Sequence, residues 1–161
     1  MRSTAENTRI IKEIANELGF NACGIAQARN LSEQEASLNN WLASGYHGNM
    51  SYMTNHFDKR LDPVKLVPGA KSVVSLLYNY YPKKDLAEGN ELKIAKYAYG
   101  KDYHEVIREK LNLFLGKIKD IVGEVEGRAF VDSAPIMERQ WAQLAGLGWL
   151  GKNGLLLNKQ M

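Results

Sequence analysis

Residues 128–144, RAFVDSAPIMERQWAQL, join a strand pattern to a helix pattern and so indicate an α/β fold. RAFVD (128–132) is predicted to be a buried strand that Ser133 and Pro135 end, because proline has no N–H for a sheet ladder. Asp132 is therefore expected at the carboxyl end of a strand, where open α/β sheets bind ligands. The alternative is that Asp132 only caps the following helix or turn. That helix is predicted from apolar residues at helical spacing, namely Ile136, Trp141, Leu144 and Leu147.

Three further helices are predicted from caps and apolar spacing. The first covers residues 6–18 and stops at Gly19. The second begins with Ser32 and Glu35 as a capping box and ends near Gly45. The third, HEVIREKLNLFLGKIKDIV, follows Asp102 as its N-cap and carries a broad apolar stripe.

Strand patterns alternate with these helices. ACGIAQA (22–28), SVVSLLYNYY (72–81, ended by Pro82) and KIAKYAY (93–99, ended by Gly100) are predicted strands, whereas DKRLDPVKLVPGAKS (58–72) is a predicted loop. GLGWLGKNGLLL (146–157) predicts two tight turns and a final strand. The fold class is thus α/β, a mixed α+β sheet of four or five strands with at least one antiparallel pair and helices packed on it.

Composition limits what such a domain can do. The chain has 161 residues, 45% of them hydrophobic and 24% charged, with a net charge of +3, which is typical of one globular domain. It contains no apolar run that approaches the ~20 residues of a membrane span, and its N-terminus does not resemble a signal peptide, so a cytoplasmic location is expected. Cys23 is the single cysteine, so this chain alone cannot build a disulfide, a zinc site or an iron–sulfur cluster.

Lysines gather beside glycine and aromatic residues, which suits a ligand with phosphates or an RNA, although a solvated basic face is the alternative. Three segments, YAYGKDYHE (97–105), VDSAPIMER (131–139) and AGLGWLGKNGLLL (145–157), place glycines next to polar and aromatic groups at element boundaries. GLGWLG (146–151) has the glycine order of a dinucleotide site, but a helix-like run precedes it where a strand is required.

YAYGKDYH, VDSAPIMER and AGLGWLGKNGLLL, with the upstream MSYM and RLDPVKLVPGAKSVV, resemble the amino-terminal domain of epoxyqueuosine reductases, over essentially the whole chain. The resemblance implies a single cobalamin-binding domain over residues 1–161, similar to the nitroreductase-like corrinoid domains of reductive dehalogenases. It also implies a following ferredoxin-like domain with two four-iron four-sulfur clusters, whose cysteine ligands this chain lacks, so the chain alone is expected to be inactive.

The same resemblance implies a role for individual residues. Asp132 is expected to be the proton donor in the two-electron, two-proton reduction that removes the epoxide oxygen of epoxyqueuosine, because burial under the corrin would help it to hold a proton. His104 is not expected to ligate cobalt, and no other metal ligand is expected. For Arg60 the alternative is an exposed arginine in a loop, and for Tyr97 and Tyr99 it is the ordinary burial of aromatic side chains. For the glycines of GWLGKNG the alternative is turn geometry. The residues expected to bind cobalamin are Arg60, Tyr97, Tyr99, Asp132, Ser133, Gly148, Trp149, Gly151, Lys152 and Asn153.

The expected partner is the anticodon loop of a tRNA that carries epoxyqueuosine. Neither a membrane nor DNA is expected as a partner, and the protein is expected to be a monomer. Seven lysines are expected to collect around one rim of the pocket, at positions 83, 84, 93, 96, 101, 152 and 159. A non-catalytic corrinoid carrier or an RNA-binding module remains the alternative function.

Overall fold

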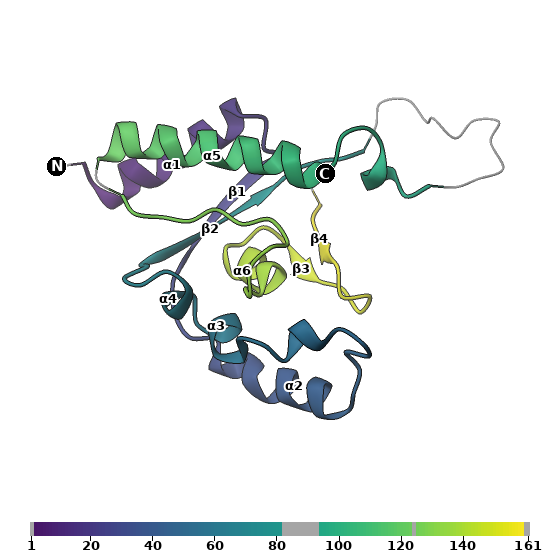
Figure 1. The fold of residues 1–161 in the computed structure, drawn as a ribbon. Coiled ribbons are helices and arrows are strands. Elements are labelled where there is room, and N and C mark those ends of the chain that lie inside the picture. The colour runs from purple at the N-terminus through teal and green to yellow at the C-terminus, as the bar shows by residue number, and fades with distance from the viewer. Residues whose placement is uncertain (1, 82–93, 124, 160–161) are drawn as a thin grey trace. The chain divides into compact units, whose positions relative to one another are not determined.

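The computed structural model describes residues 2–81, 94–123 and 125–159, which form helices and two small sheets (Figure 1). The chain divides into two compact units: unit 1 comprises Met1–Cys23 and Leu76–Ser133, and unit 2 comprises Gly24–Ser75 and Ala134–Gln160. In chain order the elements are α1 (Thr4–Glu17), β1 (Ala22–Gln27), α2 (Ser32–Ala43), η1 (Ser51–Met53), α3 (Phe57–Leu61), α4 (Pro63–Leu66), β2 (Ser72–Leu77), η2 (Lys96–Ala98), α5 (Tyr103–Val122), α6 (Glu138–Leu144), β3 (Trp149–Leu150) and β4 (Leu156–Leu157).

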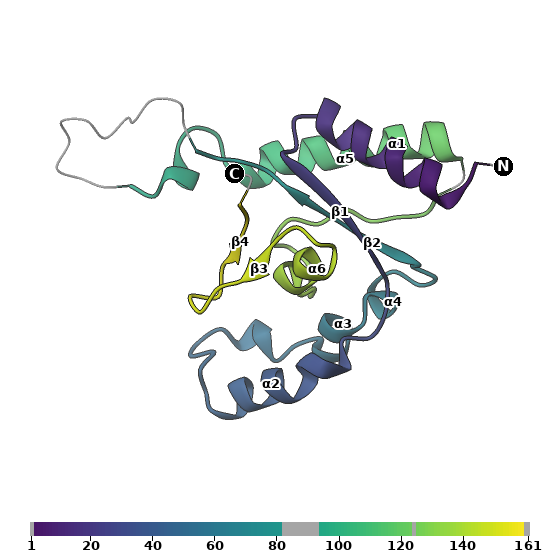
Figure 2. The same ribbon diagram turned by 180° about the vertical axis from the view of Figure 1, so that it is seen from behind.

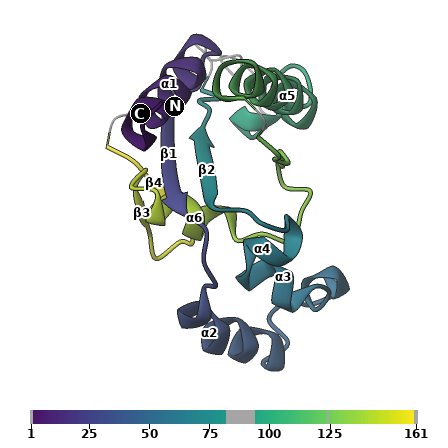
Figure 3. The same cartoon turned by 90° about the vertical axis from the view of Figure 1, so that its left-hand side faces the viewer.

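Unit 1 is built on two helices that lie side by side, α1 and α5, as the end-on view shows (Figure 3). Ile14, Phe114 and Ile118 are buried, which accounts for the apolar spacing in both helices. Phe20 follows α1 and meets Phe114 edge to face, with ring centroids 6.2 Å apart. Lys110 Nζ donates to the Leu18 carbonyl at 2.6 Å, so a side chain of α5 satisfies a carbonyl at the end of α1.

Unit 2 has its own core, centred on Trp141 of α6. Leu31, Leu38 and Leu61 are buried with Trp141 in one apolar cluster. The strands β3 and β4 form an antiparallel hairpin that contacts α6, with Trp149 opposite Leu157 and Leu150 opposite Leu156 (Figure 2). The predicted antiparallel pair is therefore confirmed.

The strands β1 and β2 are neighbours in a second two-stranded sheet. Both predicted strands are confirmed at these positions, although β2 ends at Leu77, and Pro82 lies outside the described residues. The division between the two units falls inside both strands, after Cys23 and after Ser75.

Two predicted strands are wrong. Residues 128–132 have no regular secondary structure, and only Val131 of the apolar run is buried. KIAKYAY contains the 3₁₀ turn η2 instead, and its first residue, Lys93, lies outside the described residues. The described strands therefore form two separate pairs in place of one mixed sheet.

Two local predictions between β1 and β2 are also wrong. The predicted loop at 58–72 contains most of α3 and all of α4. Pro63 occupies the first turn of α4, where its missing N–H costs nothing. Asp62 caps the same helix, because its Oδ1 accepts from Val64 N at 3.0 Å. The capping box is absent from α2, whose N-cap is Leu31 without a side-chain cap bond. Leu31 N instead donates to the Leu61 carbonyl at 2.8 Å.

Among the residues that the structure describes, no helix has the length and apolar character needed to cross a bilayer.

Cys23 lies on β1, where partial burial raises the pKa of its thiol to about 11. The thiolate is the nucleophile, so below pH 9 the thiolate fraction should be about 100-fold lower than for an ordinary thiol with a pKa of 9.0. At pH 8 we expect iodoacetamide to alkylate Cys23 about 100-fold more slowly in the folded chain than in the urea-unfolded chain. Mass spectrometry of the alkylated chain over time measures the two rates. Equal rates in the two states would contradict this environment for Cys23.

Candidate active site

The chain around Asp132 is irregular, and its backbone conformation is unusual. Asp132 has a φ of 50°, in the left-handed region that few residues other than glycine adopt. The preceding residue, Val131, is buried, whereas the Asp132 side chain is 56% exposed. A buried apolar side chain, Val131, therefore precedes an exposed carboxylate, that of Asp132. Asp132 does not cap α6, because the N-cap of that helix is Met137, without a side-chain cap bond; the alternative that Asp132 caps a turn stays a prediction.

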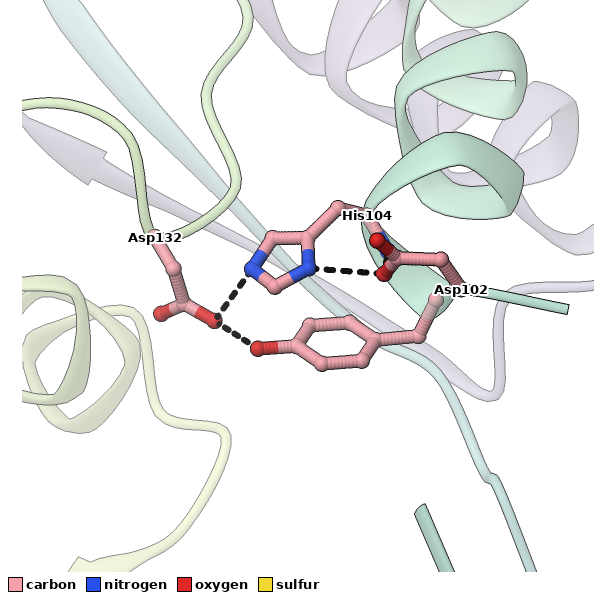
Figure 4. Close-up of polar contacts among 4 residues, drawn as sticks. Asp102, His104 and Asp132 are labelled. Carbon is pink, nitrogen blue, oxygen red and sulfur yellow. Dashed lines mark hydrogen bonds and ion pairs between the residues drawn. The ribbon is translucent and has the colours of Figure 1, made fainter. Parts of the chain in front are cut away.

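The Asp132 carboxylate meets the first turn of α5. The Tyr103 hydroxyl donates to Asp132 Oδ2 at 2.7 Å, across 29 residues of sequence (Figure 4). Tyr103 is the first residue of α5, and Asp102 caps that helix by accepting from His104 N at 2.9 Å. The predicted N-cap is thus confirmed. It fixes the start of the helix that presents Tyr103 to Asp132.

His104 lies between two carboxylates. Its Nδ1 is 2.8 Å from Asp102 Oδ1, and its Nε2 is 3.9 Å from Asp132 Oδ2 (Figure 4). The imidazole also stacks on the Tyr103 ring, with centroids 4.0 Å apart and an interplanar angle of 29°. Two packed rings from consecutive residues therefore contact one acidic side chain.

The hydrogen bonds set the protonation of two of these groups. The Asp132 carboxylate, which accepts the Tyr103 hydroxyl, is the main reason that the pKa of Tyr103 rises to about 12, with desolvation by burial as a second cause. The backbone and imidazole N–H groups of His104 hold the pKa of Asp102 below its usual value. At neutral pH Tyr103 is therefore a donor, and Asp102 is an ionised acceptor.

Aromatic side chains extend from this site. Tyr97 packs edge to face on Tyr103 with centroids 6.1 Å apart, and Tyr80 packs on Tyr97 in the same way at 6.3 Å. Tyr97 and Tyr99 were expected to leave a strand on one side, but Tyr97 belongs to η2 and Tyr99 is its C-cap. Among the predicted residues of unit 1, Tyr97 contacts Tyr103, which in turn binds Asp132. Ser133 follows Asp132 in the chain and is exposed.

The other predicted cofactor residues lie in unit 2. Arg60, near the end of α3, donates from Nη2 to the Tyr52 carbonyl at 3.0 Å. Its Nε is buried and has no hydrogen-bond partner within the described part of the chain. A buried guanidinium donor of this kind is an expected place for a polar ligand atom to bind.

The hairpin carries the remaining predicted residues, and its own packing already explains two of its glycines. A Cβ at Gly148 would lie 2.1 Å from the Leu157 carbonyl oxygen, and one at Gly151 would lie 2.7 Å from Asn153 Oδ1. Trp149 is 45% exposed, and Lys152 and Asn153 are exposed at the turn. Arg139 of α6 donates to the Gly154 carbonyl, which ties the turn to its helix.

Sequence patterns did not identify Tyr103 as a partner of Asp132, and they gave His104 no role. The N-cap signal at Asp102 located the start of the helix, so it indicated that residues 103 and 104 occupy a first turn. No periodicity relates that turn to a residue 29 positions later. The contact depends on the path of the irregular segment 125–133.

Several known proteins similar to the chain are epoxyqueuosine reductases. The family model described as epoxyqueuosine reductase QueG, DUF1730, matches residues 60–133. An epoxyqueuosine reductase from Cyclobacterium marinum is 63% identical over 99% of this chain, which covers 52% of that protein. The chain thus spans about half the length of three curated relatives that it matches.

Solved structures show the same fold. A crystal structure of epoxyqueuosine reductase with an epoxyqueuosine-modified tRNA-Tyr stem loop superimposes with a TM-score of 0.84 at 24% identity, over 97% of this chain and 42% of that one. A Bacillus subtilis epoxyqueuosine reductase, whose aspartate catalytic loop is swung out of the active site, superimposes with a TM-score of 0.81 at 23% identity, over 97% of this chain and 42% of its own. By sequence, the chain is similar to epoxyqueuosine reductases, of whose length it spans about half.

Proposed function

We propose that this chain is the cobalamin-binding part of an enzyme that reduces epoxyqueuosine in tRNA, with Asp132 as the proton donor. The observation that carries the proposal is the outward Asp132 carboxylate, which the Tyr103 hydroxyl holds at 2.7 Å. Relatives named epoxyqueuosine reductase, one of them bound to a modified tRNA stem loop, support the substrate class. The aspartate catalytic loop of the Bacillus subtilis protein supports Asp132 as its counterpart.

The residues of unit 2 fit a corrinoid. Cobalamin presents a flat apolar ring with an amide-bearing rim, so it needs exposed apolar surface beside hydrogen-bond donors. The hairpin offers Trp149 and Leu155 as exposed apolar side chains and Lys152 as an exposed donor, and Arg60 has the buried Nε described above. A nitroreductase-like assignment of the domain, a following iron–sulfur domain and binding of the tRNA anticodon loop belong to the same proposal.

Asp132 has the chemistry that the reaction needs. An alkoxide leaves carbon poorly until it is protonated, and a positioned acid supplies that proton. Bound cobalamin, once reduced, would supply the electrons. The proton would move from a carboxyl oxygen of Asp132 to the epoxide oxygen, and the Tyr103 hydroxyl would keep the side chain in one orientation throughout.

Cobalamin binding tests this proposal without catalysis. We expect cob(II)alamin to bind the chain with a change in its visible spectrum, and Trp149→Ala to weaken binding by about tenfold, because an aromatic side chain that a ligand buries contributes roughly 1.5 kcal/mol. Tyr46→Ala is the matched control, since Tyr46 is an exposed aromatic residue of the same unit with no assigned role. No spectral change at high micromolar cobalamin would contradict the proposal, and binding unaffected by Trp149→Ala would remove the hairpin from it.

A further inference from the structure

We propose that Asp102, His104 and Asp132 form a proton relay in which His104 returns a proton to Asp132 after each turnover. This inference rests on the proposed function, because it presupposes that Asp132 gives up a proton. It adds a task for two side chains outside the predicted site, Asp102 and His104. All three residues lie in unit 1, and His104 is the middle one (Figure 4).

Asp102 fixes which imidazole nitrogen carries hydrogen. Its Oδ1 accepts from His104 N at 2.9 Å and lies 2.8 Å from His104 Nδ1. An ionised carboxylate has no hydrogen to donate, so the hydrogen in the second contact belongs to Nδ1. A neutral His104 therefore has its lone pair on Nε2, which is the nitrogen that faces Asp132.

The distance between His104 Nε2 and Asp132 Oδ2 suits intermittent transfer. At 3.9 Å the two atoms are just beyond hydrogen-bond reach, and a shift of roughly 1 Å would bring them within it. Oδ2 is also the oxygen to which the Tyr103 hydroxyl donates, and the Tyr103 ring stacks against the imidazole. Tyr103 thus holds both partners. It does not compete as a source of protons, because its pKa rises to about 12.

His104 can collect protons from water because its side chain is 39% exposed. A hydronium ion of the solvent gives its proton to Nε2 and leaves as water, and the imidazolium that forms lies between the carboxylates of Asp102 and Asp132. Arg108, farther along α5, acts electrostatically on Asp102 and helps to keep it ionised. In the transfer the Nε2–H bond breaks and an O–H bond forms on Asp132, so His104 returns to neutrality and no electrons move.

The relay separates the first turnover from later ones, because His104 returns a proton only after Asp132 has given one up. In a full-length reductase that contains this chain, we expect His104→Gln to slow steady-state turnover by about tenfold or more, below the ~100-fold that a direct proton donor contributes. A single turnover with excess enzyme should stay within about threefold of the wild-type rate, and added imidazole should restore multiple turnovers. His56→Asn is the control, since His56 is an exposed histidine without an assigned role.

A spectroscopic readout on the chain itself accompanies the kinetics. Nitrogen NMR of neutral His104 should show hydrogen on Nδ1 in the wild type and a mixture of tautomers in Asp102→Asn, because an asparagine amide can donate as well as accept. Asparagine caps helices about as well as aspartate, so the fold should persist.

Three outcomes would overturn the relay: unchanged steady-state turnover in His104→Gln, an equal loss in single and multiple turnovers, or hydrogen on Nε2 in the wild type. The second would make His104 a positioning residue for Asp132. None of these three outcomes contradicts the proposed function, provided that the wild type reduces epoxyqueuosine in tRNA. A folded, cobalamin-loaded wild type without that activity would instead contradict the proposed function.

Discussion

Asp132→Asn is expected to lower the turnover of a full-length reductase that contains this chain by about 100-fold or more, because positioned proton transfer contributes about two to four orders of magnitude. Asparagine has nearly the same shape as aspartate, and its side-chain carbonyl can still accept the Tyr103 hydroxyl that now binds Asp132 Oδ2 at 2.7 Å. It lacks an acidic proton to give to a leaving oxygen. The measurement is the rate at which the modified tRNA is reduced, with cobalamin binding determined for the same preparation.

Cobalamin affinity within a few-fold of the wild type is required before that rate is interpreted. Asp120→Asn is the matched control, because Asp120 is an exposed aspartate of α5 in the same unit. A folded, cobalamin-bound and fully active Asp132→Asn enzyme would remove Asp132 from the mechanism.

Trp141→Ala is expected to destabilise the chain by about 3–5 kcal/mol, which is the usual cost of removing a large aromatic side chain from a core. Trp141 is 1% exposed and packs with Leu31, Leu38 and Leu61. Removing the indole would leave a cavity that these three side chains can fill only in part. Its Nε1 is buried with no hydrogen-bond partner among the described residues, so the loss should come from packing. Urea unfolding followed by circular dichroism measures the change.

The chain offers its own control for that experiment. Trp149 is the same residue type but is 45% exposed, so Trp149→Ala should cost about 1 kcal/mol or less. Comparable losses in the two variants would mean that Trp141 does not anchor the core of unit 2.

Helices with a cap and a long apolar stripe could be predicted from sequence. The isoleucines of the first helix recur because Ile14 packs in the core of unit 1, and Asp102 is the N-cap of the long helix α5. Such signals are local, because a helix makes its hydrogen bonds within one segment. The two-stranded pairing of β1 with β2 was compatible with the strand patterns but was not encoded in either strand alone.

The two strand failures have a common physical origin. RAFVD and KIAKYAY have strand-like composition, but a strand needs a neighbour for its backbone groups, and composition does not show whether one is present. The prolines at 58–72 predict a loop, although Pro63 at the first turn of a helix is favourable. The two strand errors therefore concern context that the segments themselves do not contain, whereas the helix start at Asp62 and Pro63 is a signal within its own segment.

The candidate site likewise combines a residue that its own motif predicts with residues that only the fold brings to it. Asp132 was selected from its own motif, and its exposed carboxylate agrees with a chemical role, although the role itself stays a prediction. Tyr103 and His104 reach it only because an irregular segment brings residue 132 back to the start of α5. Contacts of that kind need coordinates. The cofactor roles of Arg60 and the hairpin residues remain predictions.

The left-handed backbone at Asp132 restricts which amino acids a mutational library could recover there. Most side chains lose roughly 1–2 kcal/mol in this conformation, whereas glycine, asparagine and aspartate tolerate it. With a φ of 50° at this position, a screen for folded protein should therefore enrich those three residues whether or not the enzyme turns over. A second screen for tRNA reduction should then retain aspartate alone. The difference between the two enrichments would separate what the backbone demands at this position from what the chemistry demands.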